Sequence, residues 1–395
     1  MCSIRRSHYC AALLLALILC LASASTRLQA DTGTCGGASI TLPFTDVPSS
    51  NIFFCSIAAA YFSGLTNGTS PTTYSPSASV TRDQMAAFIT RTQDSVLRRS
   101  RQRAALNQWA PGSFSAGGMT SVGTRPQLVQ SDGADLWVAD SFDETVSRVR
   151  ASDGKLLETW TGAERAFGVL VARGRIFVTG NTNPGKLYRI DPRQPAGAVA
   201  VVTSGLGPVP TGITTDGNSI WTANVGGSVS RVDPGNGDVT TFTTGFNQPT
   251  GILYDGSHVW VTEYSPGKLL KLNPDGTIEQ TVTVGNGVWN PIFDGTNIWV
   301  PSLISNSLTV VRAATGTVLA TLTGNGLNGP YTAAFDGERI LVTNNGGESV
   351  SLWKAASLTP LGSFNAGTDS VPLGACSDGI NFWITLNVAG KLARF

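Results

Sequence analysis

The sequence predicts a mainly β protein, in which a seven-bladed β-propeller spans residues 106–395 and follows a small α-helical module. Two observations lead to this prediction. A unit consisting of an Asp-Gly turn and an aromatic strand recurs about every 40 residues, which is the length of a four-stranded propeller blade. The chain of 395 residues also contains 45 glycines and only 13% charged residues, a composition typical of short strands and tight turns.

Each repeat is defined by its aromatic position. In one unit, Asp216-Gly217 precedes Trp221, and an Asp-Gly pair is a strong hairpin signal. The equivalent positions are 137, 177, 221, 260, 299, 341 and 383, occupied by Trp except at Phe177 and Leu341. We expect these aromatic side chains to pack between neighbouring sheets rather than to form a carbohydrate-binding platform. A parallel β-helix would need a shorter repeat.

The seventh unit has room for only three strands before the chain ends at Phe395. Residues 112–118 (GSFSAGG) are similar to residues 362–368 (GSFNAGT), which are expected to form an outer strand. We therefore predict that a strand near residues 109–115 completes the last blade. Closure of this kind joins the two ends of the ring and leaves no exposed sheet edge.

The N-terminus has the features of a secretory signal peptide. Arg5 and Arg6 precede the apolar run 11–19, and an Ala-x-Ala site ends at Ala24. We predict a signal peptide over residues 1–24, with cleavage after Ala24 or alternatively after Ala30. A retained anchor is the other interpretation, although the apolar run is short for a membrane span. Export would place the protein at the bacterial cell surface or in the periplasm.

Three cysteines remain after this cleavage. Cys35 and Cys55 are close in the sequence, whereas Cys376 lies in an apolar strand far along the chain. Three cysteines allow three pairings. In an oxidising compartment we expect a disulfide between Cys35 and Cys55 and a buried thiol at Cys376.

The helical module is predicted to span residues 36–92. The apolar spacing predicts a helix from about Ile52 to Phe62, which ends before Gly64. Thr81 and Gln84 form a capping-box pattern at the start of a second helix. Residues 93–105 continue it as a basic helical linker, for which we expect a solvated face; contact with anionic envelope polymers is the alternative.

This module resembles an S-layer homology motif over roughly residues 42–92. The matching positions run in the order of that motif: Phe44, Asp46, Val47, Gly64, Leu65, Gly68, Tyr74, Pro76, Thr81, Arg82 and Gln84. The resemblance implies attachment to the cell envelope, often to wall polysaccharide, through Thr81, Arg82 and Gln84. The family commonly has three tandem copies and often a Glu at the position of Gln84, whereas this sequence shows one copy.

The repeats resemble two groups of propellers. Residues 341–351 (LVTNNGGESVS) look like the YVTN-type repeat of surface-layer proteins, and residues 210–234 look like blades of NHL proteins and streptogramin lyases. These groups share an architecture but not one function. The resemblance therefore implies a propeller more firmly than an activity.

Polar residues recur where each aromatic strand ends. We predict that they lie on one face, at the mouth of the propeller channel, and form a ligand site: Asp140, Asn181, Asn224, Glu263, Ser302, Asn344 and Asn387. Carboxylate and amide oxygens suit Ca²⁺ or Mg²⁺, with Asp140 and Glu263 as the candidate metal ligands. The alternative is that Asn and Asp serve turn geometry at the strand ends.

These features favour a non-catalytic binding or scaffold protein of the cell envelope. Its expected partner is wall polysaccharide or another envelope component, with a surface protein or glycan as a further partner, and we expect a monomer. The net charge of +1 gives no field for binding nucleic acid. The alternative is a metal-dependent lyase or lactonase-type hydrolase acting at the channel mouth. Glu263 matches the lyase-like blades, but His258 is the one histidine outside the signal peptide, so the His and Glu pair of the lyases is not reproduced.

Overall fold

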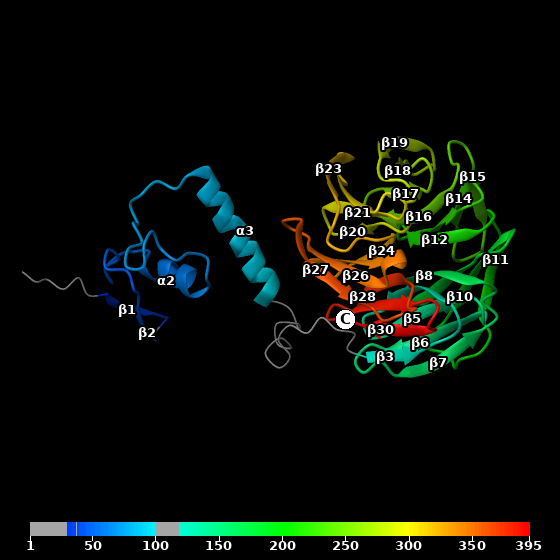
Figure 1. Ribbon diagram of the computed structural model, residues 1–395, viewed down its shortest axis with the longest axis horizontal. Coiled ribbons are helices and arrows are strands. Elements are labelled where there is room, and N and C mark those ends of the chain that lie inside the picture. Colours follow the sequence, from blue (N-terminus) through cyan, green and yellow to red (C-terminus); the bar gives the residue numbers. More distant parts are fainter. Residues whose placement is uncertain (1–29, 37, 100–117) are drawn as a thin grey trace, which may run out of the picture. The chain divides into compact units, whose positions relative to one another are not determined.

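The computed structural model describes residues 30–36, 38–99 and 118–395 (Figure 1). The chain divides into two compact units, residues 1–100 and 101–395, and each is described separately. The predicted signal peptide, the stretch 109–115 and residues 100–105 of the predicted linker lie outside the described residues. Within the described ranges, no helix has both the length and the apolar character needed to cross a membrane.

The first unit combines a two-stranded sheet with two helices. Strand β1 (Thr32–Cys35) pairs antiparallel with β2 (Ala38–Thr41), and the helices are α2 (Phe54–Phe62) and α3 (Arg82–Arg99). Helix α2 begins two residues later than predicted, because the Asn51 side chain accepts the N–H of Phe53 at 2.8 Å and keeps this segment in a turn. Cys35 and Cys55 form a disulfide that joins β1 to α2.

The residues of this unit that match the S-layer homology motif have structural partners. The Asp46 carboxylate accepts the backbone N–H groups of Tyr74 and Ser75 at 2.8 and 2.7 Å. Phe44 is fully buried, and its ring lies 5.2 Å from that of Tyr61. Asp46, near the start of the motif, therefore fixes the turn at Tyr74 and Ser75 that precedes α3, although it lies almost 30 residues earlier in the sequence.

The second unit consists of seven four-stranded antiparallel sheets. The strands of blades 1 to 4, from the innermost outwards, are β4 (Pro126–Ser131), β5 (Asp135–Asp140), β6 (Thr145–Arg150) and β7 (Leu156–Thr161); β8 (Ala166–Ala172), β9 (Arg175–Gly180), β10 (Gly185–Ile190) and β11 (Ala200–Leu206); β12 (Pro210–Thr215), β13 (Ile220–Asn224), β14 (Ser228–Val232) and β15 (Val239–Phe242); and β16 (Pro249–Tyr254), β17 (Val259–Glu263), β18 (Lys268–Leu272) and β19 (Ile278–Thr283).

Blades 5 to 7 follow the same order. Their strands are β20 (Ile292–Phe293), β21 (Asn297–Ser302), β22 (Ser307–Arg312) and β23 (Thr317–Leu322); β24 (Pro330–Phe335), β25 (Arg339–Asn344), β26 (Ser349–Lys354) and β27 (Thr359–Asn365), with the short helix η1 (Asn345–Gly347); and β28 (Pro372–Ser377), β29 (Phe382–Leu386), β30 (Lys391–Arg394) and β3 (Gly118–Ser121). Each innermost strand contacts the next one, and β28 contacts β4, so the ring of seven blades is closed. The predicted seven-bladed propeller is confirmed.

The strand that completes the last blade lies later than we predicted. Gly118 pairs with Arg394 and Ser121 with Lys391, so residues 118–121 form the outer strand of the last blade. Gly123, two residues after this strand, directs its backbone N–H to the Asp140 carboxylate in the first blade.

An Asp–Trp clamp holds the second strand of five blades. The Asp of the turn accepts the indole N–H of the buried Trp at 2.7–2.9 Å in the pairs 132–137, 216–221, 255–260, 294–299 and 378–383. These Trp side chains are at most 1% exposed, as expected for core residues. In blade 6, where Leu341 replaces Trp, the guanidinium of Arg339 bonds the Asp336 carboxylate at 2.7 and 2.9 Å instead.

Glycines and threonines join neighbouring blades near the axis. A Cβ on Gly251 would lie 2.4 Å from the Trp289 carbonyl oxygen of the next blade, so only glycine fits this approach. Thr262 accepts the Gly251 N–H at 2.8 Å and donates to the Trp289 carbonyl at 2.7 Å. Thr385 donates to the Gln127 carbonyl at 2.6 Å and thereby links the last blade to the first.

Candidate functional site

One face of the propeller is built by the same backbone bond in every blade. The residue after the second strand donates its N–H to a carbonyl in the loop that enters the blade; the acceptor directly precedes the first strand in every blade except blade 5, where it is Gly287 and the strand begins at Ile292. The donor–acceptor pairs are 141–125, 181–165, 225–209, 264–248, 303–287, 345–329 and 387–371. This bond brings the loop that leaves the second strand next to the loop that enters the blade, so both kinds of loop share the face, as we expected.

The seven predicted site residues divide into two sets on this face. Asp140, Asn224, Glu263, Ser302 and Asn344 are the last residues of their strands and are at most 2% exposed. Asn181 and Asn387 come one residue later, at the position of the backbone bond. Successive residues of a strand point to opposite sides. The structure therefore does not bring the seven side chains together.

Asp140 is buried inside blade 1. Its carboxylate accepts the Ser147 hydroxyl at 2.7 Å and the Thr145 hydroxyl at 3.4 Å. Burial raises the pKa of Asp140 to about 7, and the hydrogen bonds from Ser147, Gly123 and Thr145 offset only part of that effect. Its Oδ1 atom has no partner among the described residues, which favours the protonated carboxyl.

The equivalent positions in blades 3, 4 and 6 are also satisfied internally. The Asn224 amide donates to the Ser228 and Ser230 hydroxyls at 3.1 and 2.9 Å, and the Asn344 amide makes the same pair of bonds in blade 6. The Glu263 carboxylate accepts the Asn247 backbone N–H at 3.0 and 3.1 Å. Burial raises the pKa of Glu263, against the lowering effect of the Asn247 N–H.

These contacts bear on the predicted Ca²⁺ or Mg²⁺ site. Asp140 and Glu263 belong to blades 1 and 4, and each carboxylate bonds groups of its own blade. Within the described ranges, no group of three or more His, Cys, Asp or Glu side chains is arranged to hold a metal ion. His258 lies near Glu279, with Nε2 at 3.7 Å from the carboxylate oxygen. The residues described do not fit the predicted cation.

The other two predicted residues have different surroundings. Asn387 is 6% exposed, and its amide donates to the Pro126 carbonyl at 3.0 Å, a second link between the last blade and the first. Asn181 is half-buried and lines a pocket. Ser302 is fully buried, and its hydroxyl has no partner among the described residues.

Aromatic residues, and not a ring of charges, occupy the centre of this face. The rings of Phe167 in blade 2 and Trp289 in blade 5 stack with centroids 6.4 Å apart, although these blades are not neighbours in the ring. Trp289 also stacks on Tyr331 at 4.6 Å and meets Tyr264 edge-on at 6.0 Å. These four residues, here called the aromatic plug, therefore cross the channel mouth.

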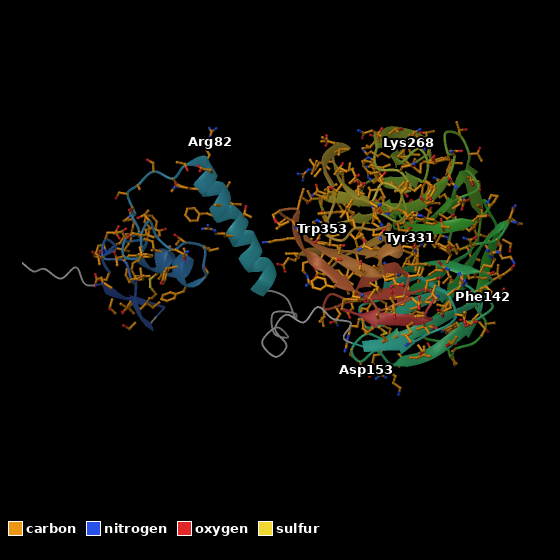
Figure 2. The ribbon with its side chains drawn as sticks, viewed as in Figure 1. Arg82, Phe142, Asp153, Lys268, Tyr331 and Trp353 are labelled. Atoms are coloured by element: carbon orange, nitrogen blue, oxygen red, sulfur yellow. A yellow bond between two sulfur atoms is a disulfide. The ribbon has the colours of Figure 1, made fainter. Side chains whose placement is uncertain are left out.

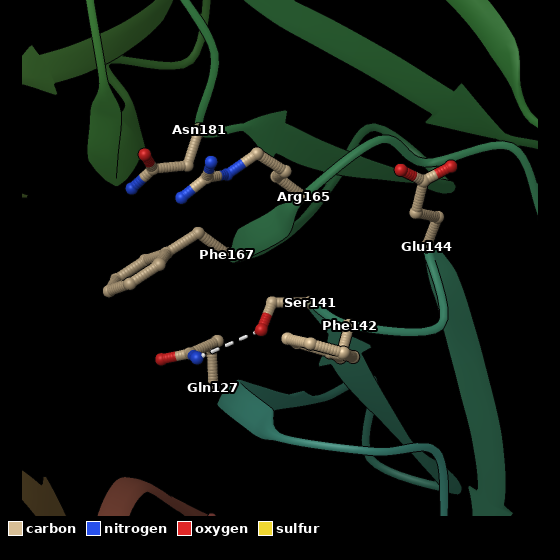
Figure 3. A pocket seen from close by; sticks show the side chains of 7 residues that line it. All are labelled: Gln127, Ser141, Phe142, Glu144, Arg165, Phe167 and Asn181. Carbon is tan, nitrogen blue, oxygen red and sulfur yellow. Dashed lines mark hydrogen bonds between the residues drawn. The ribbon is translucent and has the colours of Figure 1, made fainter.

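A pocket of about 370 Å³ lies beside the plug, between blades 1 and 2. It is lined by Gln127, Ser141, Phe142, Glu144, Arg165, Phe167 and Asn181. Figure 3 shows Arg165 and Asn181 on one side of the Phe167 ring and Gln127, bonded to Ser141 at 3.0 Å, on the other. Our sequence analysis found only Asn181 among these residues. Trp289 offered a signal for the plug, because it lies outside the periodic Trp positions.

The predicted envelope-binding residues lie at the start of α3. The Thr81 N–H donates to the Gln84 side chain at 3.0 Å, and the Gln84 N–H donates to the Thr81 hydroxyl at 3.4 Å, so these two residues form the capping box. Arg82 is exposed and extends from the first turn of the helix (Figure 2). The structure thus brings Thr81, Arg82 and Gln84 together on one helix end.

Comparison with known proteins identifies the first unit and the fold of the second. Residues 43–86 match the model of the S-layer homology domain. This segment is an S-layer homology domain. Such a domain implies association with the cell surface. No curated protein sequence matches the chain.

Solved structures resemble the propeller. Virginiamycin B lyase from Staphylococcus aureus has 17% sequence identity, a TM-score of 0.60, and coverage of 70% of this chain and 98% of its own. A streptogramin B lyase has 16% identity, a TM-score of 0.59, and coverage of 70% and 96%. Hydrazine synthase from Kuenenia stuttgartiensis has 14% identity, a TM-score of 0.61, and coverage of 72% and 99%. At these identities the likeness concerns the fold alone.

Proposed function

We propose that this protein is exported to the cell envelope, that its S-layer homology domain attaches it to a wall polymer, and that its propeller is a non-catalytic binding or scaffold unit. The observation that carries the proposal is the domain match at residues 43–86, together with the exposed Arg82 at the start of α3. The signal-peptide pattern of residues 1–24 supports export.

The attachment step follows from the chemistry of this helix end. The capping box uses the side chains of Thr81 and Gln84 to fix the first turn of α3. Arg82 is then held at a helix N-terminus, where backbone N–H groups also favour anions. A guanidinium that donates up to five hydrogen bonds at this point suits the hydroxyl and acidic groups of a wall polysaccharide.

The non-catalytic assignment of the propeller rests on the strand-end residues. Asp140, Asn224, Glu263 and Asn344 bond hydroxyls or backbone groups of their own blades. Groups used in this way stabilise the blades and are not presented to a substrate. The likeness to the solved lyase structures concerns the fold alone, so it does not support the lyase or lactonase alternative.

The proposal is tested with the mature chain and isolated bacterial cell walls. We expect the protein to sediment with intact walls and to remain in the supernatant with walls whose accessory polysaccharide has been removed by hydrofluoric acid. Serum albumin serves as the control for non-specific sedimentation. Failure to sediment with intact walls, or equal sedimentation with both preparations, would contradict attachment to a wall polysaccharide.

A further inference from the structure

We infer that the pocket between blades 1 and 2 binds a pyranose sugar of a glycan. This inference rests on the proposed function in one respect, since an envelope protein meets glycans. The binding site itself is argued from the pocket. Its lining comes from the first strands and the second-strand loops of two adjacent blades, together with Arg165 before β8, on the face that carries the aromatic plug.

The lining has the mixed chemistry that a sugar ring requires. Phe142 and Phe167 offer flat apolar surfaces, while the other five lining residues carry hydroxyl, amide, carboxylate or guanidinium groups. A pyranose presents a C–H face that packs on an aromatic ring and a rim of hydroxyls that both donate and accept hydrogen bonds. The volume of about 370 Å³ lies at the lower end of ligand pockets, roughly 300–1,000 Å³.

The same lining argues against other ligand classes. One guanidinium, Arg165, and one carboxylate, Glu144, line the pocket, so it carries no net charge for a phosphate or a metal ion. A purely apolar ligand would cover the five polar side chains of the lining and offer them no hydrogen bond, which is costly. An uncharged molecule with many hydroxyl groups satisfies both kinds of surface.

The apolar surface is fixed in place before any ligand binds. The Phe167 ring stacks on Trp289 at an interplanar angle of 21°, and Trp289 stacks on Tyr331 at 28°. The Gln127 amide is oriented by its bond to Ser141, and the Asn181 N–H is tied to the Arg165 carbonyl at 3.1 Å. A preorganised site of this kind loses little conformational entropy on binding.

Phe142 is the exposed aromatic residue of the lining, and the Arg125 guanidinium lies over its ring at 6.0 Å from the centroid. Its side chain is 73% exposed at the tip of the loop between β5 and β6. Ile304 and Val388 occupy the same loop-tip position in blades 5 and 7 and are also exposed, but they do not line this pocket.

The test uses saturation-transfer NMR on the mature chain with three disaccharides: N,N′-diacetylchitobiose, cellobiose and maltose. We expect transfer to at least one of them, reduced at least fivefold by Phe142→Ala and by Asn181→Leu. Val388→Ala is the matched control, since it shortens an exposed apolar side chain at the equivalent tip of another blade, and it should leave the transfer unchanged. Thermal unfolding of each variant verifies that the propeller remains folded.

Two results would overturn the inference. One is the absence of transfer to all three disaccharides in the unsubstituted protein. The other is transfer that persists in both pocket variants, because the sugar would then occupy another part of the molecule. Wall sedimentation is measured in parallel on the same preparations. Sedimentation without disaccharide binding would refute the pocket alone, whereas loss of sedimentation would refute the proposed attachment.

Discussion

The polar residues at the strand ends could be found in the sequence, but the surroundings of their side chains could not be predicted from it. Asp140 and Asn224 recur at the repeat period, and their residue types suit a metal or a turn equally well. The structure places both inside their blades, bonded to Ser147 and Ser230. Asn181 differs by one position in the strand, and this single step moves its side chain to the pocket. The sequence shows this step, because Asp140 lies three residues after its aromatic position and Asn181 four, but it does not show which of the two side chains faces the pocket.

The buried Asp140 predicts a pH dependence of stability. Folding raises the pKa of this carboxyl from 3.8 to about 7, so between these values the folded state holds a proton that the unfolded chain releases. The contribution of Asp140 to stability should therefore be greatest below the unfolded pKa of 3.8, fall as the pH rises from there to about 7, and stay constant at higher pH. We expect Asp140→Asn to be more stable than the unsubstituted protein at pH 8, by roughly 1–3 kcal/mol, with a smaller difference at pH 5, as measured by urea unfolding.

The reciprocal change is the control for this prediction. Asn224→Asp places a carboxyl at the equivalent position of blade 3, and it should lose more stability at pH 8 than at pH 5. A less stable Asp140→Asn variant at pH 8 would mean that the ionised carboxylate stabilises the blade, contrary to our account.

At the scale of the element, the blade is the part of the molecule that the sequence predicted best. The Asp-Gly turn and the aromatic residue after it are local signals, and the Asp–Trp clamp explains why they recur together. Arg339 shows how the clamp survives the loss of its Trp, by a guanidinium that bonds the same carboxylate oxygen. The start of α2 lies two residues later than predicted, where the Asn51 side chain bonds the Phe53 N–H, and the closing strand lies at residues 118–121, where its register is set by pairing with β30 at the other end of the ring.

Breaking one clamp should destabilise the propeller in a measurable way. Asp294→Ala removes the acceptor of the buried Trp299 indole at 2.7 Å and of the Thr296 and Asn297 N–H groups. We expect a loss of about 2–3 kcal/mol in the free energy of unfolding, since a buried donor is left unsatisfied. Asp275→Ala is the control, because it breaks an exposed turn without a Trp, and it should cost about 1 kcal/mol or less. Equal losses for both variants would refute the clamp.

At the scale of the whole molecule, each of the two compact units has its own proposed role. In our proposal, the S-layer homology domain supplies attachment, and the propeller supplies a closed ring whose binding face is organised by the aromatic plug. The propeller fold followed from the repeat length, and its seven blades followed from the seven repeats. The plug did not, because it depends on Phe167 and Trp289 meeting across the channel, a contact between distant blades that no local pattern encodes.

The separation of these roles predicts that variants of each unit affect different interactions. Arg82→Ala should weaken wall binding and leave the propeller folded and able to bind its disaccharide. Lys155→Ala, which removes an exposed positive charge from the propeller, is the control for a general effect of charge and should bind walls normally. Equal loss of wall binding in both variants would point to unspecific electrostatic attraction instead.

The most direct test of our account is the affinity of the mature chain for intact cell walls, determined by sedimentation over a range of protein concentrations for the unsubstituted protein, Arg82→Ala and Phe142→Ala. We predict at least a tenfold loss of affinity for Arg82→Ala and a change of less than twofold for Phe142→Ala. The opposite pattern, in which Phe142→Ala abolishes wall binding and Arg82→Ala retains it, would show that the propeller is the attachment unit and would contradict the account.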